Sequence, residues 1–365
     1  TVASSENALS RIADLWLDPK RGTNTALVAG MAHALIEAGR IDREFIESRT
    51  EGFAAYRESI AAMDAKQVAA LTGVKEESFA QALRLLSEAA NVMVVYGMDQ
   101  CLERSHDDVQ ALAGLLLQAG GLGRPGNGLV LVYDFANSQG LLDMGMDSRI
   151  LPGFVRPGDK KDVARLGKLW HAPLAKAFKP QDLLRRLEAG KVKALVVFGE
   201  DPLATAAGEK LLAGVEFKVV GDFFLTASAE TADVVLPLST PLESDGTYTA
   251  GDRRVQRSAA ILPPQTGWTN LEIISRLAAG LGTKLLPDGP EEIFREIAKA
   301  NPYYQGIEPG DFWGRDLAGG PWRTASGKVR FLPLAVDPAP CRQEKQFPLA
   351  TENFLRFKIK SKLVL

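Results

Sequence analysis

The sequence predicts an α/β protein made of two doubly wound, mostly parallel domains. Short apolar runs typical of strands alternate with segments whose apolar residues recur at helical spacing. The expected strands are apolar along their whole length, which is typical of parallel strands covered on both faces. A length of 365 residues, 46% of them hydrophobic, is enough for more than one globular core.

The first α/β domain is expected over residues 1–150. Two of its segments are expected to be strands, and the rest of its pattern is helical. The expected helices span 25–39, 41–50, 65–73, 76–90 and 105–120, and the strands 91–97 and 128–134. Ser105 is the expected N-cap of the last helix, and Asp107 and Asp108 then lie in its first turn, where acidic side chains stabilise a helix.

The second α/β domain is expected over residues 151–290, and residues 291–365 are expected to form a C-terminal extension. The expected order of elements is a helix at 180–190, a strand at 193–202, a short helix at 203–213, strands at 215–224 and 232–237, and a helix at 270–282. Between the last strand and the last helix, residues 239–257 are expected to form a long polar loop. Loops of that length in compact domains are usually functional.

Composition excludes several classes of protein. The net charge of −2 provides no electrostatic basis for binding nucleic acid. No apolar run reaches 18 residues, so no direct membrane insertion is expected. The two cysteines, Cys101 and Cys341, and the three histidines are scattered, so we predict no metal site in this stretch and assign no catalytic residue.

Ligands of open parallel sheets bind outside the carboxyl ends of the strands. Four segments fall at such ends: 97–100, 134–140, 199–202 and 221–231. Gly97 and Gly199 would allow close backbone approach to a ligand, and Asn137 and Gln139 carry donors and acceptors for a phosphate or a heterocycle. Ordinary turn chemistry at strand ends explains the same residues equally well.

Several motifs in order resemble the molybdopterin oxidoreductase family across nearly the whole chain. They are "ADVVLP" with "ESDGTYTAGDRRVQ", "GEDP", "YGMDQ", the run at 21–53 and "TASGKVRF". The resemblance implies two α/β domains with a cofactor cleft between them. The loop at 239–257 would cross over that cleft.

The chain also departs from the family pattern. The cysteine-rich cluster region, the metal-ligating residue and the terminal barrel are expected to be absent, and the first domain is expected to be partial. The Asp that faces guanine in many members corresponds to Asn24.

Residues 136–154 resemble most closely a branch that keeps the fold without the cofactor, the large iron–sulfur subunit of bacterial NADH-quinone oxidoreductase. The leading interpretation is therefore a scaffold in the peripheral arm of respiratory complex I. It would carry no cofactor, would not be active alone, and would bind other subunits that hold iron–sulfur clusters. Its expected location is the cytoplasm, peripheral to the inner face of the membrane through those subunits.

The alternative is a fragment of a molybdenum or tungsten bis-pterin oxidoreductase such as formate dehydrogenase. A third possibility is a binding module that shares only the fold. Under the alternative, bis-molybdopterin guanine dinucleotide would contact Gly97, Met98, Asn137, Gln139, Gly199, Glu200 and Asp222.

Overall fold

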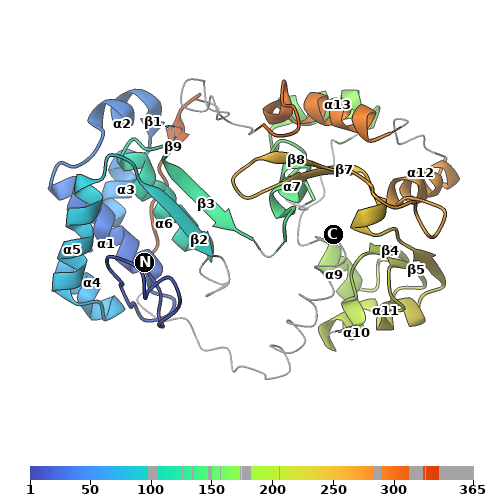
Figure 1. Cartoon of the computed structure of the whole chain (residues 1–365), viewed down its shortest axis with the longest axis horizontal. Coiled ribbons are helices and arrows are strands. Elements are labelled where there is room, and N and C mark those ends of the chain that lie inside the picture. Colours follow the sequence, from blue (N-terminus) through green and yellow to red (C-terminus); the bar gives the residue numbers. More distant parts are fainter. Residues whose placement is uncertain are drawn as a thin grey trace. The chain divides into compact units, whose positions relative to one another are not determined.

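The protein forms two compact units, each with its own core (Figure 1). The computed structural model describes residues 1–97, 105–122, 124, 126–133, 135–146, 150–156, 158–172, 174, 182–204, 206–282, 289–311, 324 and 326–336. The first unit contains residues 1–133 and also the later segment 326–336. The second unit contains the described residues from 135 to 311.

The first unit consists of helices packed on a small parallel sheet. Its helices are α1 (Asn24–Glu37), α2 (Arg43–Arg49), α3 (Phe53–Ser59), α4 (Ala65–Thr72), α5 (Glu76–Glu88) and α6 (Ser105–Gln118). Strand β2 (Met93–Gly97) pairs in parallel with β3 (Gly128–Val132). Strand β1 (Thr50–Glu51) pairs in parallel with β9 (Val329–Arg330), and this pairing ties the returning segment to the unit.

One face of β2 contributes to the core of the first unit. Val94 and Tyr96 pack against a cluster contributed mainly by α1, α4, α5 and α6, whereas Met93 and Val95 are 57% and 64% exposed. The sequence led us to expect apolar cover on both faces, because alternate residues of this strand are apolar as well. Among the residues that the structure describes, the helical core covers the side of Val94 and Tyr96, and Figure 1 shows α1, α4 and α5 together on that side of the sheet.

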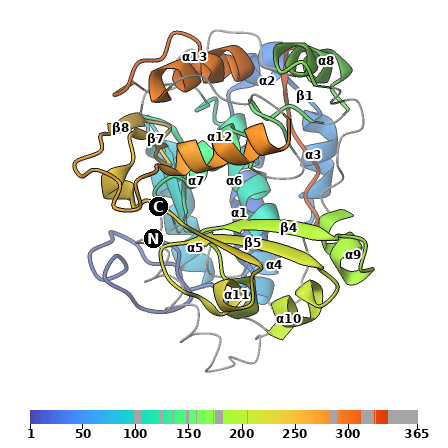
Figure 2. The same cartoon turned by 90° about the vertical axis from the view of Figure 1, so that its right-hand side faces the viewer.

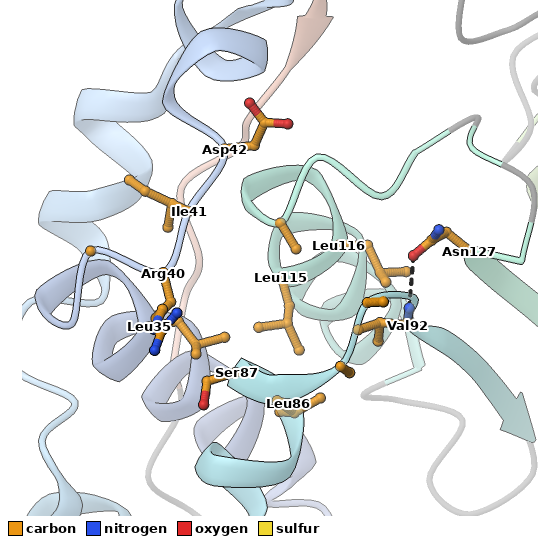
Figure 3. Close-up of a pocket in the computed structure, with 14 residues that line it drawn as sticks. Leu35, Arg40, Ile41, Asp42, Leu86, Ser87, Val92, Leu115, Leu116 and Asn127 are labelled. Carbon is orange, nitrogen blue, oxygen red and sulfur yellow. Dashed lines mark hydrogen bonds between the residues drawn. The ribbon is translucent and has the colours of Figure 1, made fainter.

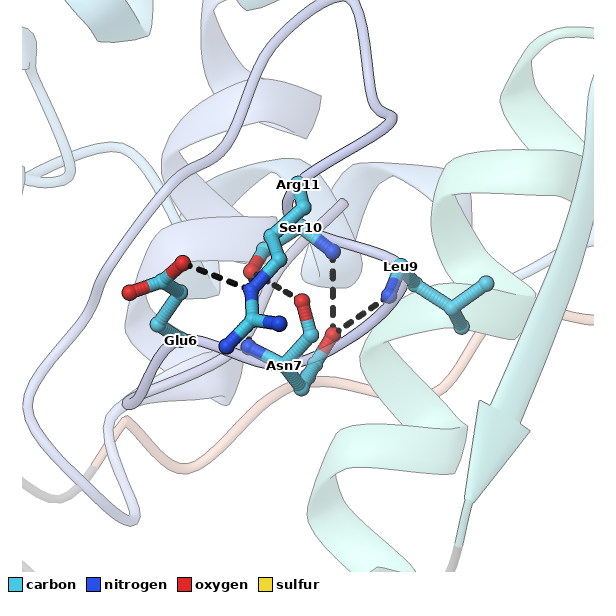
Figure 4. Close-up of polar contacts among 5 residues, drawn as sticks. All are labelled: Glu6, Asn7, Leu9, Ser10 and Arg11. Carbon is cyan, nitrogen blue, oxygen red and sulfur yellow. Dashed lines mark hydrogen bonds and ion pairs between the residues drawn. The ribbon is translucent and has the colours of Figure 1, made fainter.

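The segment before α1 is ordered by its own polar contacts (Figure 4). The Asn7 Oδ1 atom accepts hydrogen bonds from the backbone N–H groups of Leu9 and Ser10, both at 2.9 Å. The Ser10 hydroxyl accepts from the Asn7 N–H at 2.8 Å, and Arg11 forms an ion pair with Glu6. This turn leaves the Leu9 side chain 64% exposed.

The second unit contains a three-stranded parallel sheet in the order β4–β5–β6. Its strands are β4 (Ala194–Phe198), β5 (Phe217–Asp222) and β6 (Val234–Pro237). Its helices are α7 (Ser138–Asp143), α8 (Lys160–Leu169), α9 (Asp182–Glu188), α10 (Ala206–Leu212), α11 (Ala227–Glu230), α12 (Asn270–Gly280) and α13 (Pro290–Ala300), with short 3-10 turns η2 (Pro202–Ala204), η3 (Pro241–Glu243) and η4 (Pro302–Tyr304). Figure 2 shows α10 and α11 on one side of β4 and β5.

The expected long loop at 239–257 is largely a β-hairpin, so that expectation was wrong. Strand β7 (Gly246–Thr249) pairs antiparallel with β8 (Val255–Ser258). The turn between them is closed by hydrogen bonds from Arg253 N to Ala250 O (2.8 Å) and from Ala250 N to Arg254 O (3.0 Å). Arg253 has φ 69°, a left-handed conformation that usually selects Gly and costs other residues about 1–2 kcal/mol.

The prediction of an α/β fold with mostly parallel sheets is confirmed, since the hairpin is the only antiparallel pair among the named strands of the described chain. The same part of the chain contains no helix with both the length and the apolar character that a membrane crossing requires.

Candidate functional site

The carboxyl edge of the β4–β5–β6 sheet gathers three of the residues chosen from the sequence. Gly199 follows β4 directly, with φ 66°, and its N–H donates to the carbonyl of Gly221 in β5 at 2.8 Å. Glu200 comes next, and Asp222 ends β5 in a buried position, 7% exposed. The parallel order of the strands places the two carboxyl groups at the same edge of the sheet.

The charge of Asp222 acts on Glu200. Desolvation and, after it, the negative charge of Asp222 raise the pKa of Glu200 above its usual value. Asp222 Oδ1 accepts a hydrogen bond from the N–H of Phe224 at 3.0 Å, and its Oδ2 accepts none from the residues that the structure describes. Together the pair offers acceptor atoms and negative charge, which disfavour a phosphate and favour a ligand edge that carries N–H donors.

A third acidic residue beside this edge, Asp201, forms hydrogen bonds inside the protein. Asp201 Oδ1 accepts from both the N–H (3.0 Å) and the hydroxyl (2.6 Å) of Ser228 at the start of α11. The Ser228 hydroxyl in turn accepts from the N–H of Leu203. No group of three His, Cys, Asp or Glu side chains suited to a metal ion occurs in the described ranges.

Asn137 and Gln139, also chosen from the sequence, use their side chains inside the second unit. Asn137 Oδ1 accepts from the N–H of Thr249 in β7 at 2.9 Å, and Gln139 Nε2 donates to Asp143 Oδ1 at 2.8 Å. Neither forms a hydrogen bond with Glu200 or Asp222 in the part of the chain that is described. The Asn137 contact ties the start of α7 to the hairpin, whereas the Gln139 contact stays within α7.

Asp143 was not identified from the sequence. It is 0% exposed, and besides Gln139 it accepts a hydrogen bond from the Tyr304 hydroxyl at 2.7 Å. Its backbone carbonyl accepts from Asn301 Nδ2 at 3.0 Å. The available signal was an acidic residue inside the mostly apolar run "GLLDMG", a position where a carboxylate needs buried partners.

The remaining two candidates lie at the end of β2. Gly97 closes that strand and pairs with Val132 of β3. Met98 lies outside the described residues.

Asp108 is more than the favourable helix-terminal charge that the sequence suggested. It is 2% exposed and accepts hydrogen bonds from Thr25 Oγ1 (2.6 Å), the Tyr96 hydroxyl (2.9 Å) and Asn24 Nδ2 (3.2 Å). It therefore joins α6 to α1 and β2. Asn24, at the position where the family often has a guanine-facing Asp, is bound to this internal carboxylate.

A cavity of about 380 Å³ lies elsewhere in the first unit (Figure 3). Apolar side chains that line it include Leu35, Ile41, Leu86, Val92 and Leu115. Val92 and Asn127, joined by a 2.7 Å hydrogen bond, immediately precede β2 and β3. The cavity thus lies at the amino ends of these strands, opposite the edge where parallel sheets usually bind ligands.

Comparison with known proteins identifies the family. The profile of the molybdopterin oxidoreductases matches residues 1–279. The chain belongs to the molybdopterin oxidoreductase family. Acetylene hydratase from Pelobacter acetylenicus shares the fold, with a TM-score of 0.67 and 20% identity over 96% of this chain and 55% of that one.

Curated relatives of this molybdopterin oxidoreductase include formate dehydrogenases. Formate dehydrogenase H of Escherichia coli is 32% identical over 308 residues, 81% of this chain and 43% of the relative. The F420-dependent formate dehydrogenase 2 subunit alpha of Methanococcus maripaludis is 35% identical over 314 residues, 82% of this chain and 45% of the relative. The chain thus spans less than half the length of these relatives.

These relatives overturn the leading interpretation from the sequence. The large iron–sulfur subunit of NADH-quinone oxidoreductase was favoured because residues 136–154 resemble it. The expected lack of the metal-ligating residue and of the terminal barrel, together with Asn24 in place of a guanine-facing Asp, gave further support. Relatives over more than 300 residues are instead formate dehydrogenases, which supports the alternative interpretation. A short stretch was given more weight than the whole chain, and the expectation of a cofactor-free scaffold in complex I loses its basis.

Proposed function

We propose that the chain is part of a formate dehydrogenase of the molybdenum or tungsten type, and that the carboxyl edge of β4–β5–β6 binds the guanine end of a molybdopterin guanine dinucleotide. The observation that carries the proposal is that Glu200 and the buried Asp222 lie at the same carboxyl edge of the sheet. The identity with formate dehydrogenases supports the reaction class.

The residues at the edge fit a guanine ring. Guanine presents an N–H and an amino group side by side, and a carboxylate with a free oxygen accepts from both. Asp222 Oδ2 is such an oxygen among the described residues, and Glu200 adds a second carboxyl group at the same edge. Gly199 leaves room for the ring because it has no side chain.

When bound, the metal–pterin group supplies the redox chemistry of formate oxidation. The residues of this chain bind and orient its nucleotide end. Several relatives are named as alpha subunits, so we expect the chain to work in an assembly with further redox subunits.

The test measures metal and nucleotide in the purified native assembly. We expect molybdenum or tungsten, GMP released by acid in proportion to the metal, and formate-dependent dye reduction. Asp222→Asn should reduce GMP content several-fold, because the amide presents N–H donors to the guanine donors. Glu216→Gln is the matched control, since Glu216 lies at the opposite end of the sheet in an exposed ion pair. Wild-type protein without metal and GMP would refute the proposal.

A further inference from the structure

Hydrogen bonds join the chain segments that meet at the carboxyl edge of the β4–β5–β6 sheet. The N–H of Gly199, in the turn after β4, donates to the carbonyl of Gly221 in β5 at 2.8 Å. In the turn after β5, the N–H of Phe224 donates to Asp222 Oδ1 at 3.0 Å, and the Phe224 carbonyl accepts from the N–H of Thr226 at 2.9 Å. The two turns are thereby tied to β5 and to the residue that precedes α11.

The start of α11 connects back to the turn after β4. Thr226 is the N-cap of α11, and its hydroxyl accepts from the N–H of Ala229 at 3.2 Å. Ser228, in the first turn of this helix, donates its N–H and its hydroxyl to Asp201 Oδ1 at 3.0 and 2.6 Å. The same hydroxyl accepts from the N–H of Leu203 at 3.0 Å. These contacts close a ring of hydrogen bonds around the edge.

The Ser228 side chain is occupied entirely by contacts within the protein. Ser228 is 2% exposed, its single hydroxyl proton goes to Asp201, and its oxygen accepts from Leu203. Asp201 directly follows Glu200 in the chain, so fixing the backbone at Asp201 limits where Glu200 can lie. A binding group that is held by a second layer of hydrogen bonds keeps its geometry before the ligand arrives.

We propose that Asp201 is a positioning residue of the nucleotide site, which fixes the turn after β4 through Ser228 and so keeps Gly199 and Glu200 beside Asp222. That the ligand is a guanine nucleotide rests on the proposed function. An edge ordered in advance loses less conformational freedom on binding, and this strengthens the binding of the nucleotide.

A positioning role differs from a direct contact in what it requires of Asp201. Positioning needs an oxygen that accepts two hydrogen bonds from Ser228, and the amide oxygen of asparagine also accepts two. A direct contact with the N–H donors of guanine needs the carboxylate itself, as is proposed for Asp222. Asp201→Asn should therefore preserve the site, whereas Asp201→Ala should not.

The test measures GMP content and amide hydrogen exchange in the purified native assembly. For Asp201→Ala and for Ser228→Ala, we expect GMP content to fall several-fold and exchange across 199–204 to become about tenfold faster, with exchange in β4–β6 unchanged. The double variant should be no worse than either single variant, because both remove the same contact. Asp201→Asn should keep GMP content within about twofold of wild type.

Asp233→Ala is the matched control at the amino end of the same sheet. Asp233 Oδ2 accepts from the N–H of Lys218 at 2.7 Å, so the substitution also removes a carboxylate that binds backbone. It should change neither GMP content nor exchange across 199–204. If it lowers GMP content as much as Asp201→Ala does, the effect comes from the stability of the sheet and the positioning role is overturned.

The remaining outcomes separate the positioning role from the proposed function. Equal loss of GMP in Asp201→Asn and Asp201→Ala would overturn positioning, because the charge would then be what matters. Unchanged exchange across 199–204 in Ser228→Ala would overturn it as well. Faster exchange with normal GMP content would overturn the role in binding. If wild-type protein holds no GMP while Ser228→Ala still speeds exchange, the ordering of the turn stands and the proposed function falls.

Discussion

Two buried tyrosine hydroxyls differ in what surrounds them, and this difference predicts opposite effects of the same substitution. Tyr56 is 0% exposed, and its hydroxyl has no hydrogen-bond partner among the described residues, whereas that of Tyr304 donates to Asp143. Tyr56→Phe should therefore raise the free energy of unfolding by about 1 kcal/mol, since an unsatisfied polar group leaves the core. Tyr304→Phe should lower it by about 1.5–3 kcal/mol, because a hydrogen bond to a charged group is lost. Urea denaturation measures both.

The surroundings of Tyr56 provide a check on this reasoning. Its ring packs against Phe53 and Phe331, with centroids 6.3 and 5.0 Å away, so phenylalanine keeps these contacts. A Cβ on Gly114 would come within 2.7 Å of the ring, so Gly114→Ala should destabilise the same core. A Tyr56→Phe protein less stable than wild type would contradict the view that the hydroxyl is unsatisfied.

For single residues, the sequence predicted the position of a side chain correctly where the order of the strands alone fixes that position. Glu200 and Asp222 come together because parallel strands end at one edge, which follows from strand order. The partners of Asn137 and Gln139 could not be predicted in this way. Thr249 lies 112 residues from Asn137 in the sequence, and the hairpin that brings it there was expected to be a loop.

At the level of one element, the carboxyl edge of the sheet should show a distinct pH dependence. Desolvation and the charge of Asp222 raise the pKa of Glu200 in the folded state above its usual 4.5. The folded protein then binds more protons than the unfolded chain, so the Glu200 contribution to stability falls as pH rises from about 4.5 through the raised pKa. Glu200→Gln should remove this loss and gain stability relative to wild type toward neutral pH. Unfolding free energies of both proteins from pH 4 to 8 measure the difference.

Glu216→Gln provides the comparison for this prediction. It removes a carboxylate from the opposite end of β5, where the side chain is exposed and ion-paired with Lys193. If both variants change the pH profile equally, the effect does not come from the carboxyl edge.

Helices and strands with a strong repeat of apolar residues were predicted from the sequence. Elements that are marked mainly by the residues at their ends or turns were not. Helices α1, α4, α5, α6 and α12 and the strands β2 to β6 were found close to their expected positions, whereas the short parallel strands β1 and β9 were not predicted. Helix α13 was missed although Gly289, Pro290 and two acids at its start are ordinary signals for a helix beginning. The hairpin was missed because Arg253 occupies the turn position where Gly would have marked it.

At the scale of the whole molecule, the fold and the family followed from motifs in order, whereas the branch of the family did not. The choice of branch depended on the short stretch 136–154, on family segments expected to be missing, and on the substitution at Asn24. Asn24 hydrogen-bonds to Asp108 inside the first unit, so its identity reflects internal packing as well as any ligand. A substitution at one ligand position is therefore weak evidence for the loss of a cofactor.

Because the chain divides into two units, we expect a substitution in the core of one unit to change the stability of that unit alone. The core cluster of the first unit includes Leu27 and Tyr56, and those of the second draw on other residues, among them Leu187 and Tyr304. Because no described cluster mixes the two, Tyr56→Phe should change exchange protection only in peptides of the first unit, and Thr249→Val only in those of the second. Hydrogen exchange followed by mass spectrometry over a series of urea concentrations tests this. Equal changes in both units after either substitution would show that the two cores unfold as one cooperative structure, since a local change would then be shared by the whole.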